Sequence, residues 1–120
     1  SHVYYVYPLV LDVEQLGIPK DKIHEALSFE GVPVSKNYVN LHLLPMYQQK
    51  IAYGKKGFPW SSNIYNGSVQ YKKGICPVAE DMNDSKYLGI GMCSYEYSYA
   101  EIDLIIESFH KVWNNLEKLL

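Results

Sequence analysis

His42 is the side chain in this sequence most readily connected with ligand binding. An imidazole titrates near neutral pH, and it can bond to a sugar hydroxyl or to a phosphate oxygen. Tyr38 lies four residues before His42, and Tyr47 follows it; both rings could stack on a ligand or bond to it. The chain has twelve tyrosines, so core or interface packing is the simpler explanation of each. A hydrogen-bonded, half-buried histidine is the alternative for His42.

Other reactive side chains give weaker signals. Glu80 and Asp81 are adjacent acids at the start of an expected helix, where they would stabilise the positive end of its dipole. Cys76 and Cys93 have no metal-binding spacing, so we expect two small buried thiols, a reducing cytoplasmic location and no metal site. The chain also lacks the short motifs of self-contained hydrolases, nucleotide-binding proteins and zinc proteases. We therefore assign no catalytic residue.

Composition and charge exclude two classes of partner. The net charge of -2, without clustered basic residues, argues against binding to nucleic acid. All 11 basic residues are lysine, so the chain has no arginine for bidentate recognition of a carboxylate or phosphate. The apolar run Val3–Leu11 is much shorter than the roughly 20 residues that span a membrane, and it has no basic leader or cleavage site. We expect a soluble, unprocessed protein without a membrane partner.

Hydrophobic patterning predicts three strands. The run from Val3 to Asp12 is apolar on both faces, which favours a central strand covered on both sides. Residues Val32–Ser35 form a short second strand, which Pro33 pushes toward an edge or a bulge. Residues Tyr87–Met92 alternate loosely as a third strand, which Gly89 and Gly91 weaken.

Start and stop signals predict three helices. One covers Lys20–Phe29 and ends at Gly31, and a short one begins at Pro77 and runs to Asp81 or beyond. Ser98 and Glu101 form a capping-box pattern that begins a long terminal helix. Its apolar residues recur at helical spacing, so we expect them to form a core-facing stripe. They are Ile102, Ile105, Ile106, Phe109, Val112, Trp113 and Leu116.

Residues 37–74 form an irregular insert rich in glycine, proline and large aromatic rings. Only Pro45–Ala52 is expected to form a helical turn or two, and Gly54–Trp60 is not expected to be helical. So long an irregular stretch in a compact domain is usually functional. We expect the binding site there. The whole chain is expected to form a single domain of α+β class, with a small, mostly antiparallel sheet packed with helices.

The order of several weak motifs resembles the carboxy-terminal small domain of the DegT/DnrJ/StrS family of sugar aminotransferases. The matching segments are His2–Tyr7, Leu16–Leu27, Glu30–Val34, Tyr38–Tyr47, Cys76–Glu80 and Ser98–Ile106. The resemblance implies the C-terminal fold of fold type I enzymes that use pyridoxal phosphate. It also implies that the large domain, with the cofactor lysine and the phosphate site, is absent from this chain.

The same resemblance implies a function for the parent protein and roles for particular residues. Such an enzyme transfers an amino group from glutamate or glutamine to a keto sugar, typically nucleotide-linked, in polysaccharide or glycoconjugate biosynthesis, and it is a homodimer. The residues 37–74 would face the active site. Tyr38 and His42 carry over as substrate-binding residues, with Asn37 and Tyr47 as further candidates. The fragment alone would be inactive.

Two other classes of function stay open on the sequence. A free-standing small-ligand module could use the aromatic residues of the insert as its binding surface. A protein-interaction module could instead bury the same rings in a dry interface, because tyrosine and tryptophan are enriched at such contacts. A saturable ligand and a stable monomer would distinguish the first class from the second.

Overall fold

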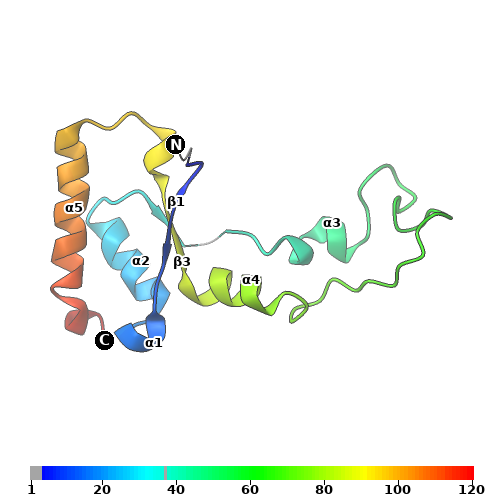
Figure 1. Cartoon of the computed structure of the whole chain (residues 1–120), viewed down its shortest axis with the longest axis horizontal. Coiled ribbons are helices and arrows are strands. Elements are labelled where there is room, and N and C mark those ends of the chain that lie inside the picture. Colours follow the sequence, from blue (N-terminus) through cyan, green and yellow to red (C-terminus); the bar gives the residue numbers. More distant parts are fainter. Residues whose placement is uncertain (1–3, 37) are drawn as a thin grey trace. The chain divides into compact units, whose positions relative to one another are not determined.

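The computed structural model describes residues 4–36 and 38–120, which form two compact units (Figure 1). The sheet unit comprises residues 1–38 and 82–120, and the insert lobe comprises residues 39–81. The chain therefore leaves the sheet unit after Tyr38 and returns to it at Met82. Within the predicted strand Val3–Asp12, Val3 lies outside the described residues.

A three-stranded antiparallel sheet is the frame of the sheet unit. It consists of β1 (Tyr7–Val10), β3 (Tyr87–Ile90) and β2 (Val34–Ser35), in the spatial order β1-β3-β2. Tyr7 lies opposite Ile90, which in turn lies opposite Val34. The predicted α+β class with a small antiparallel sheet is confirmed.

The predicted central position of the first strand is wrong, because β1 lies at an edge and β3 occupies the middle. The backbone N–H of Leu11 donates to the carbonyl of Lys86 at 2.9 Å, so the odd-numbered residues of β1 direct their backbone groups toward β3. Pro8 is even-numbered, and its missing N–H therefore falls on the free edge, where no ladder bond is lost. Val10 also points away from the core and is 60% exposed.

Helix α2 (Lys20–Phe29) supplies the centre of the hydrophobic core. Ile23 and Leu27 are fully buried, and they meet Leu88 of β3 in one cluster. Gly31 follows the helix with φ +84°, a left-handed conformation that favours glycine. The predicted helix is confirmed; a single turn, α1 (Val13–Leu16), precedes it and ends at left-handed Gly17.

Helix α5 (Tyr99–Trp113) begins at the predicted capping box. Ser98 Oγ accepts the N–H of Glu101 at 3.3 Å, and Glu101 Oε2 accepts the N–H of Ser98 at 2.8 Å. The helix packs beside α2 and buries Val112 in the core (Figure 1). A short 3₁₀ helix, η4 (Leu116–Leu119), follows it.

The predicted core stripe of α5 is only partly correct. Ile105, Phe109 and Leu116 pack against the core beside Val112. Ile106 is 47% exposed, however, so this residue of the stripe does not lie in the core of the sheet unit. Trp113 is likewise exposed. The reason is geometric: the stripe covers a wider arc of the helix than the seam with α2 can bury.

A buried lysine joins the two segments at which the chain leaves and re-enters the sheet unit. Lys20 is 4% exposed, and its Nζ donates to the carbonyls of Lys36 at 2.8 Å and Asn83 at 2.5 Å. Lys36 precedes the insert lobe, and Asn83 lies in the π-helical turn η2 (Met82–Lys86) just after it. Burial lowers the pKa of Lys20 below 10.5, against the opposing effect of Asp21 and Asp84.

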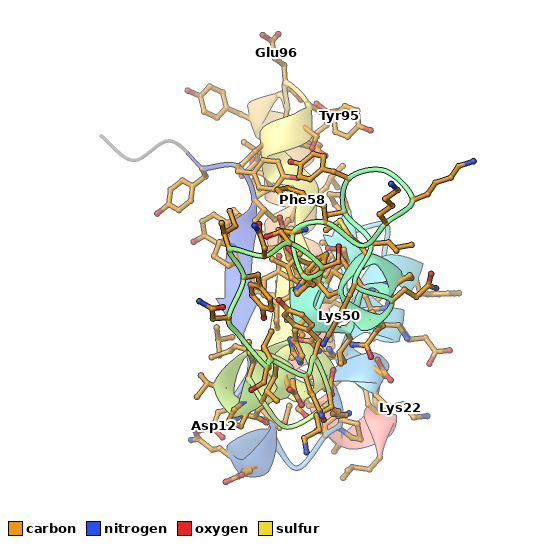
Figure 2. All side chains as sticks on the ribbon, turned by 90° about the vertical axis from the view of Figure 1, so that its right-hand side faces the viewer. Asp12, Lys22, Lys50, Phe58, Tyr95 and Glu96 are labelled. Atoms are coloured by element: carbon orange, nitrogen blue, oxygen red, sulfur yellow. The ribbon has the colours of Figure 1, made fainter. Side chains whose placement is uncertain are left out.

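The insert lobe has little regular structure, as predicted. Its elements are the 3₁₀ turn η1 (Leu41–Leu43), the single-turn helix α3 (Pro45–Gln48) and the short helix α4 (Pro77–Asp81). Between α3 and α4 the chain is irregular apart from an isolated bridge between Tyr53 and Phe58. These two rings pack at 6.1 Å between centroids, and Phe58 can be found in Figure 2.

Candidate functional site

His42, the leading candidate from the sequence, forms a buried ion pair or hydrogen bond with Glu80. His42 Nε2 lies 2.8 Å from Glu80 Oε1, and the two side chains are only 9% and 7% exposed. The pair joins η1, near the first residue of the insert lobe, to α4, near its last residue. Sequence reasoning did not connect the two residues, because 38 positions separate them and no local pattern links them.

Glu80 lies at the centre of a group of hydrogen-bond donors. The N–H of Gly74 donates to both of its carboxylate oxygens at 2.8 Å, and the N–H of Cys76 donates to Oε1 at 3.2 Å. Burial alone would raise the pKa of Glu80, but these backbone donors and His42 outweigh it and hold the pKa below its usual value of 4.5. Glu80 is therefore a carboxylate at neutral pH.

Gln48 fixes the backbone of His42. Its Nε2 donates to the carbonyl of His42 at 2.7 Å and also to the carbonyl of Tyr71. The imidazole is thus held through Glu80 and the main chain through Gln48. Within the described residues, His42 Nδ1 makes no hydrogen bond, and Ser62 Oγ is the buried side-chain atom found without one. Glu80 engages Nε2, and Nδ1 is the ring nitrogen left for another partner.

Tyr47 packs in a cluster of three aromatic rings. Its ring centroid lies 5.1 Å from that of Tyr71 and 6.2 Å from that of Trp60. Trp60 Nε1 donates to the hydroxyl of Tyr71 at 3.2 Å. This packing agrees with the simpler explanation of Tyr47, and it forms a half-buried aromatic cluster within the lobe.

The other two predicted substrate-binding residues are placed differently. Tyr38 belongs to the sheet unit, is 52% exposed and meets Tyr87 edge to face at 6.3 Å. Asn37 lies outside the described residues. The structure thus places His42 and Tyr47 in one unit and Tyr38 in the other. Sequence reasoning missed Glu80 and Gln48 as the groups that orient His42.

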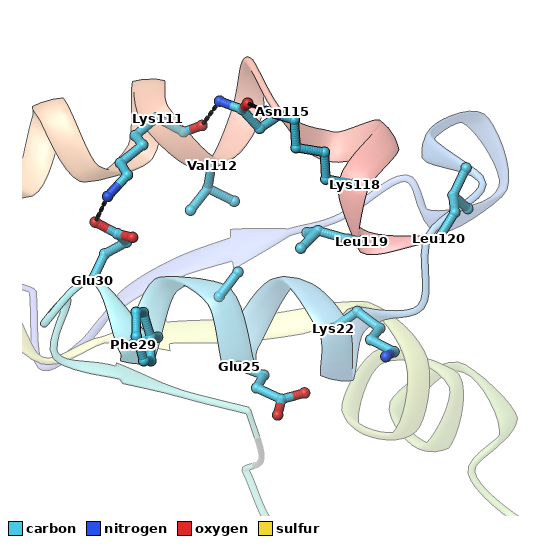
Figure 3. Close-up of a pocket in the computed structure, with 11 residues that line it drawn as sticks. Lys22, Glu25, Phe29, Glu30, Lys111, Val112, Asn115, Lys118, Leu119 and Leu120 are labelled. Carbon is cyan, nitrogen blue, oxygen red and sulfur yellow. Dashed lines mark hydrogen bonds and ion pairs between the residues drawn. The ribbon is translucent and has the colours of Figure 1, made fainter.

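A groove of about 590 Å³ lies between α2 and the end of the chain (Figure 3), and none of these residues lines it. Ala26, Val112 and Leu119 are among the apolar side chains that line it. Two of its lysines already have partners: Lys111 bonds to Glu30 and Lys118 to Asn115. Charges of both signs line the groove, so its chemistry does not define a ligand class.

Neither a metal-binding cluster nor a membrane-spanning helix is found among the described residues. Across residues 4–36 and 38–120, histidine, cysteine and acidic side chains form no group of three or more suited to a metal ion. Cys76 is half-buried and Cys93 is exposed, and both are free thiols, so the expected burial of both is wrong for Cys93. No helix in the described part of the chain has the length and apolar character needed to cross a bilayer.

Comparison with known proteins gives two distant relatives. The chain is 26% identical over 90 residues to the uncharacterized protein MJ1066 of Methanocaldococcus jannaschii, covering 75% of this chain and 22% of that protein. It is 26% identical over 69 residues to the spore coat polysaccharide biosynthesis protein SpsC of Bacillus subtilis, covering 57% of this chain and 18% of that protein. No family model and no solved structure matches the chain. The aligned parts thus make up about a fifth of each relative.

Proposed function

We propose that this chain is the carboxy-terminal small domain of a cytoplasmic, homodimeric aminotransferase that uses pyridoxal phosphate. The enzyme transfers an amino group from glutamate or glutamine to a keto sugar, usually nucleotide-linked, in the biosynthesis of a polysaccharide or glycoconjugate. Tyr38, His42 and Tyr47 are the proposed sugar-binding residues, together with Asn37.

The observation that carries the proposal is the similarity to SpsC, whose name assigns that protein to spore coat polysaccharide biosynthesis. The order of motifs that resembles the DegT/DnrJ/StrS family supports the finer assignment to amino transfer. The α+β fold with a small antiparallel sheet agrees with the small domain of such enzymes. Since the alignments cover only 22% and 18% of the relatives, the chemistry itself is assigned to the rest of a longer protein.

The described residues of this chain do not fit pyridoxal phosphate. The cofactor needs a lysine for its Schiff base and a phosphate-binding site. Lys20, the lysine buried in the core, has its Nζ bonded to the carbonyls of Lys36 and Asn83. The cofactor would therefore be held by the remainder of the protein, and no lysine of this chain is assigned to it.

Exposed apolar side chains support a role as part of a larger protein. Phe29 is 88% exposed, Tyr99 is 89% exposed and Ile64 is 80% exposed. These side chains are available for contact with the rest of a longer protein. We expect the isolated chain to bind a hydrophobic dye more strongly than an ordinary monomer of its size does, and binding at the ordinary level would count against the proposal.

The direct test of the sugar site is His42→Ala in the full-length protein. We expect turnover of nucleotide-linked keto sugars to fall, while the single-turnover release of 2-oxoglutarate from glutamate without sugar stays unchanged because that half of the reaction does not involve the sugar. Lys55→Ala, at an exposed position in the same lobe, is the matched control. Unchanged sugar turnover in His42→Ala would remove His42 from the site.

A further inference from the structure

We propose that Glu80 is a positioning residue that keeps the proton of His42 on Nε2, so that the imidazole offers the Nδ1 lone pair to a hydroxyl of the sugar. This inference rests on the proposed function, because that function brings a sugar to His42. It adds a residue outside the predicted site and decides which ligand group the imidazole receives.

The charge of Glu80 sets the direction of the bond between the two side chains. Glu80 is ionised, and a carboxylate only accepts hydrogen bonds. His42 Nε2, 2.8 Å from Oε1, must therefore be the donor. In a neutral imidazole the other nitrogen, Nδ1, then carries a lone pair and accepts.

Backbone N–H groups hold Glu80 itself in place. Both of its oxygens accept the N–H of Gly74, and Oε1 also accepts the N–H of Cys76. The carboxylate is therefore oriented by backbone groups as well as by the imidazole. A fixed partner on one ring nitrogen is the usual way in which proteins set the tautomer and orientation of a functional histidine.

The free acceptor on the ring decides which ligand group His42 can take. A sugar hydroxyl can donate to Nδ1, which is the nitrogen that Glu80 does not engage. A fully ionised phosphate has only acceptor oxygens, so it gains nothing from an acceptor nitrogen. Of the two ligands that the sequence left open for His42, the geometry therefore selects the hydroxyl and not the phosphate.

The test is nuclear magnetic resonance of ¹⁵N-histidine in the 120-residue chain, with the His42 signals assigned by their loss in His42→Gln. At neutral pH we expect one protonated nitrogen, Nε2, and one unprotonated nitrogen, Nδ1. Glu80→Gln can keep an amide oxygen at the Oε1 position, where it accepts from Cys76 and from His42, so the proton should stay on Nε2. Glu80→Ala removes this acceptor, and the proton should then be shared between Nε2 and Nδ1.

Three results would overturn the proposal: two protonated nitrogens in the parent chain, a proton on Nδ1 in the parent chain, or an unchanged tautomer in Glu80→Ala. Glu101→Gln is the matched control. It removes another carboxylate that accepts a backbone N–H, but in the capping box of α5 and not beside His42. We expect this variant to leave the His42 signals in place.

The full-length protein separates this inference from the proposed function. Glu80→Ala should raise the KM for the keto sugar about tenfold, the equivalent of one lost hydrogen bond, with little change in the single-turnover release of 2-oxoglutarate from glutamate without sugar. Glu80→Gln, which keeps the acceptor, should leave the KM near that of the unmodified protein. A mixed tautomer with an unchanged sugar KM in Glu80→Ala would overturn the contact between Nδ1 and the sugar. Failure of 2-oxoglutarate release in the unmodified protein would instead contradict the aminotransferase assignment.

Discussion

The hydroxyl of Tyr87 lies over Gly89 on the central strand, so close that a Cβ added at position 89 would come within 2.5 Å of Tyr87 Oη. The same Cβ would lie 2.9 Å from Ser35 Oγ and 3.1 Å from Val6 Cγ2. Gly89 thus provides the space in which Tyr87 lies flat along the outer face of β3. Burial there raises the pKa of Tyr87 above 10.0, with smaller contributions from Tyr38 and Tyr5.

Gly89→Ala should therefore destabilise the sheet unit by about 1 to 3 kcal/mol, the usual cost of overpacking. Denaturant unfolding measures the loss. In the Tyr87→Phe background, which lacks the closest atom, the same substitution should cost less, and the double-mutant cycle gives the coupling. Equal costs in the two backgrounds would contradict the contact between Tyr87 and Gly89.

Lys20→Met should destabilise the protein by about 1 to 3 kcal/mol, because the carbonyls of Lys36 and Asn83 lose their common donor. Methionine keeps most of the buried apolar stem. Hydrogen exchange should also become faster around residues 36 and 83, where the chain passes between the two units. Lys22→Met, at an exposed position on the same helix, is the control and should change stability by less than about 0.5 kcal/mol.

The insert lobe should lose stability in acid through Glu80. The folded pKa of Glu80 lies below its usual 4.5, so its contribution is present above that pH and is lost as the pH falls through the lower folded pKa. Trp60 lies in the lobe and Trp113 in the sheet unit, so Trp60 fluorescence in a Trp113→Phe background reports on the lobe alone. Glu80→Gln should flatten this acid transition, and an unchanged transition would contradict the role of Glu80.

Ser98→Ala should cost about 1 kcal/mol, because α5 loses the side chain that accepts the N–H of Glu101. Thermal unfolding followed by circular dichroism measures the effect. Ser94→Ala, at an exposed position before the helix, is the comparison and should be near neutral. A loss no larger in Ser98→Ala than in Ser94→Ala would mean that the capping box adds no stability.

The parts of the fold that could be predicted from the sequence depend on local signals. The start of α5 was predictable because Ser98 and Glu101 are three residues apart, and α2 was predictable from Pro19, its apolar spacing and Gly31. The order of the strands was not, because pairing between β1 and β3 joins residues about 80 positions apart. A run of apolar residues does not reveal which of its edges is paired.

The candidate site was predictable only in part, for the same reason. His42 stood out as an isolated histidine in an aromatic-rich stretch, but its partner Glu80 looked like an ordinary acid at a helix start. Glu80 does bond to backbone N–H groups beside α4, as helix stabilisation requires, and it reaches His42 as well. The second role depends on how the irregular chain between η1 and α4 folds back, which no periodicity encodes.

The central claim is that this chain belongs to an aminotransferase that acts on a keto sugar. The most direct test is to supply the full-length protein with glutamate or glutamine and with nucleotide-linked keto sugars, and to detect the amino sugar by mass spectrometry. We expect an amino sugar and an equal amount of the 2-oxo acid formed from the donor. Neither product with any donor, from folded protein supplied with pyridoxal phosphate, would contradict the account.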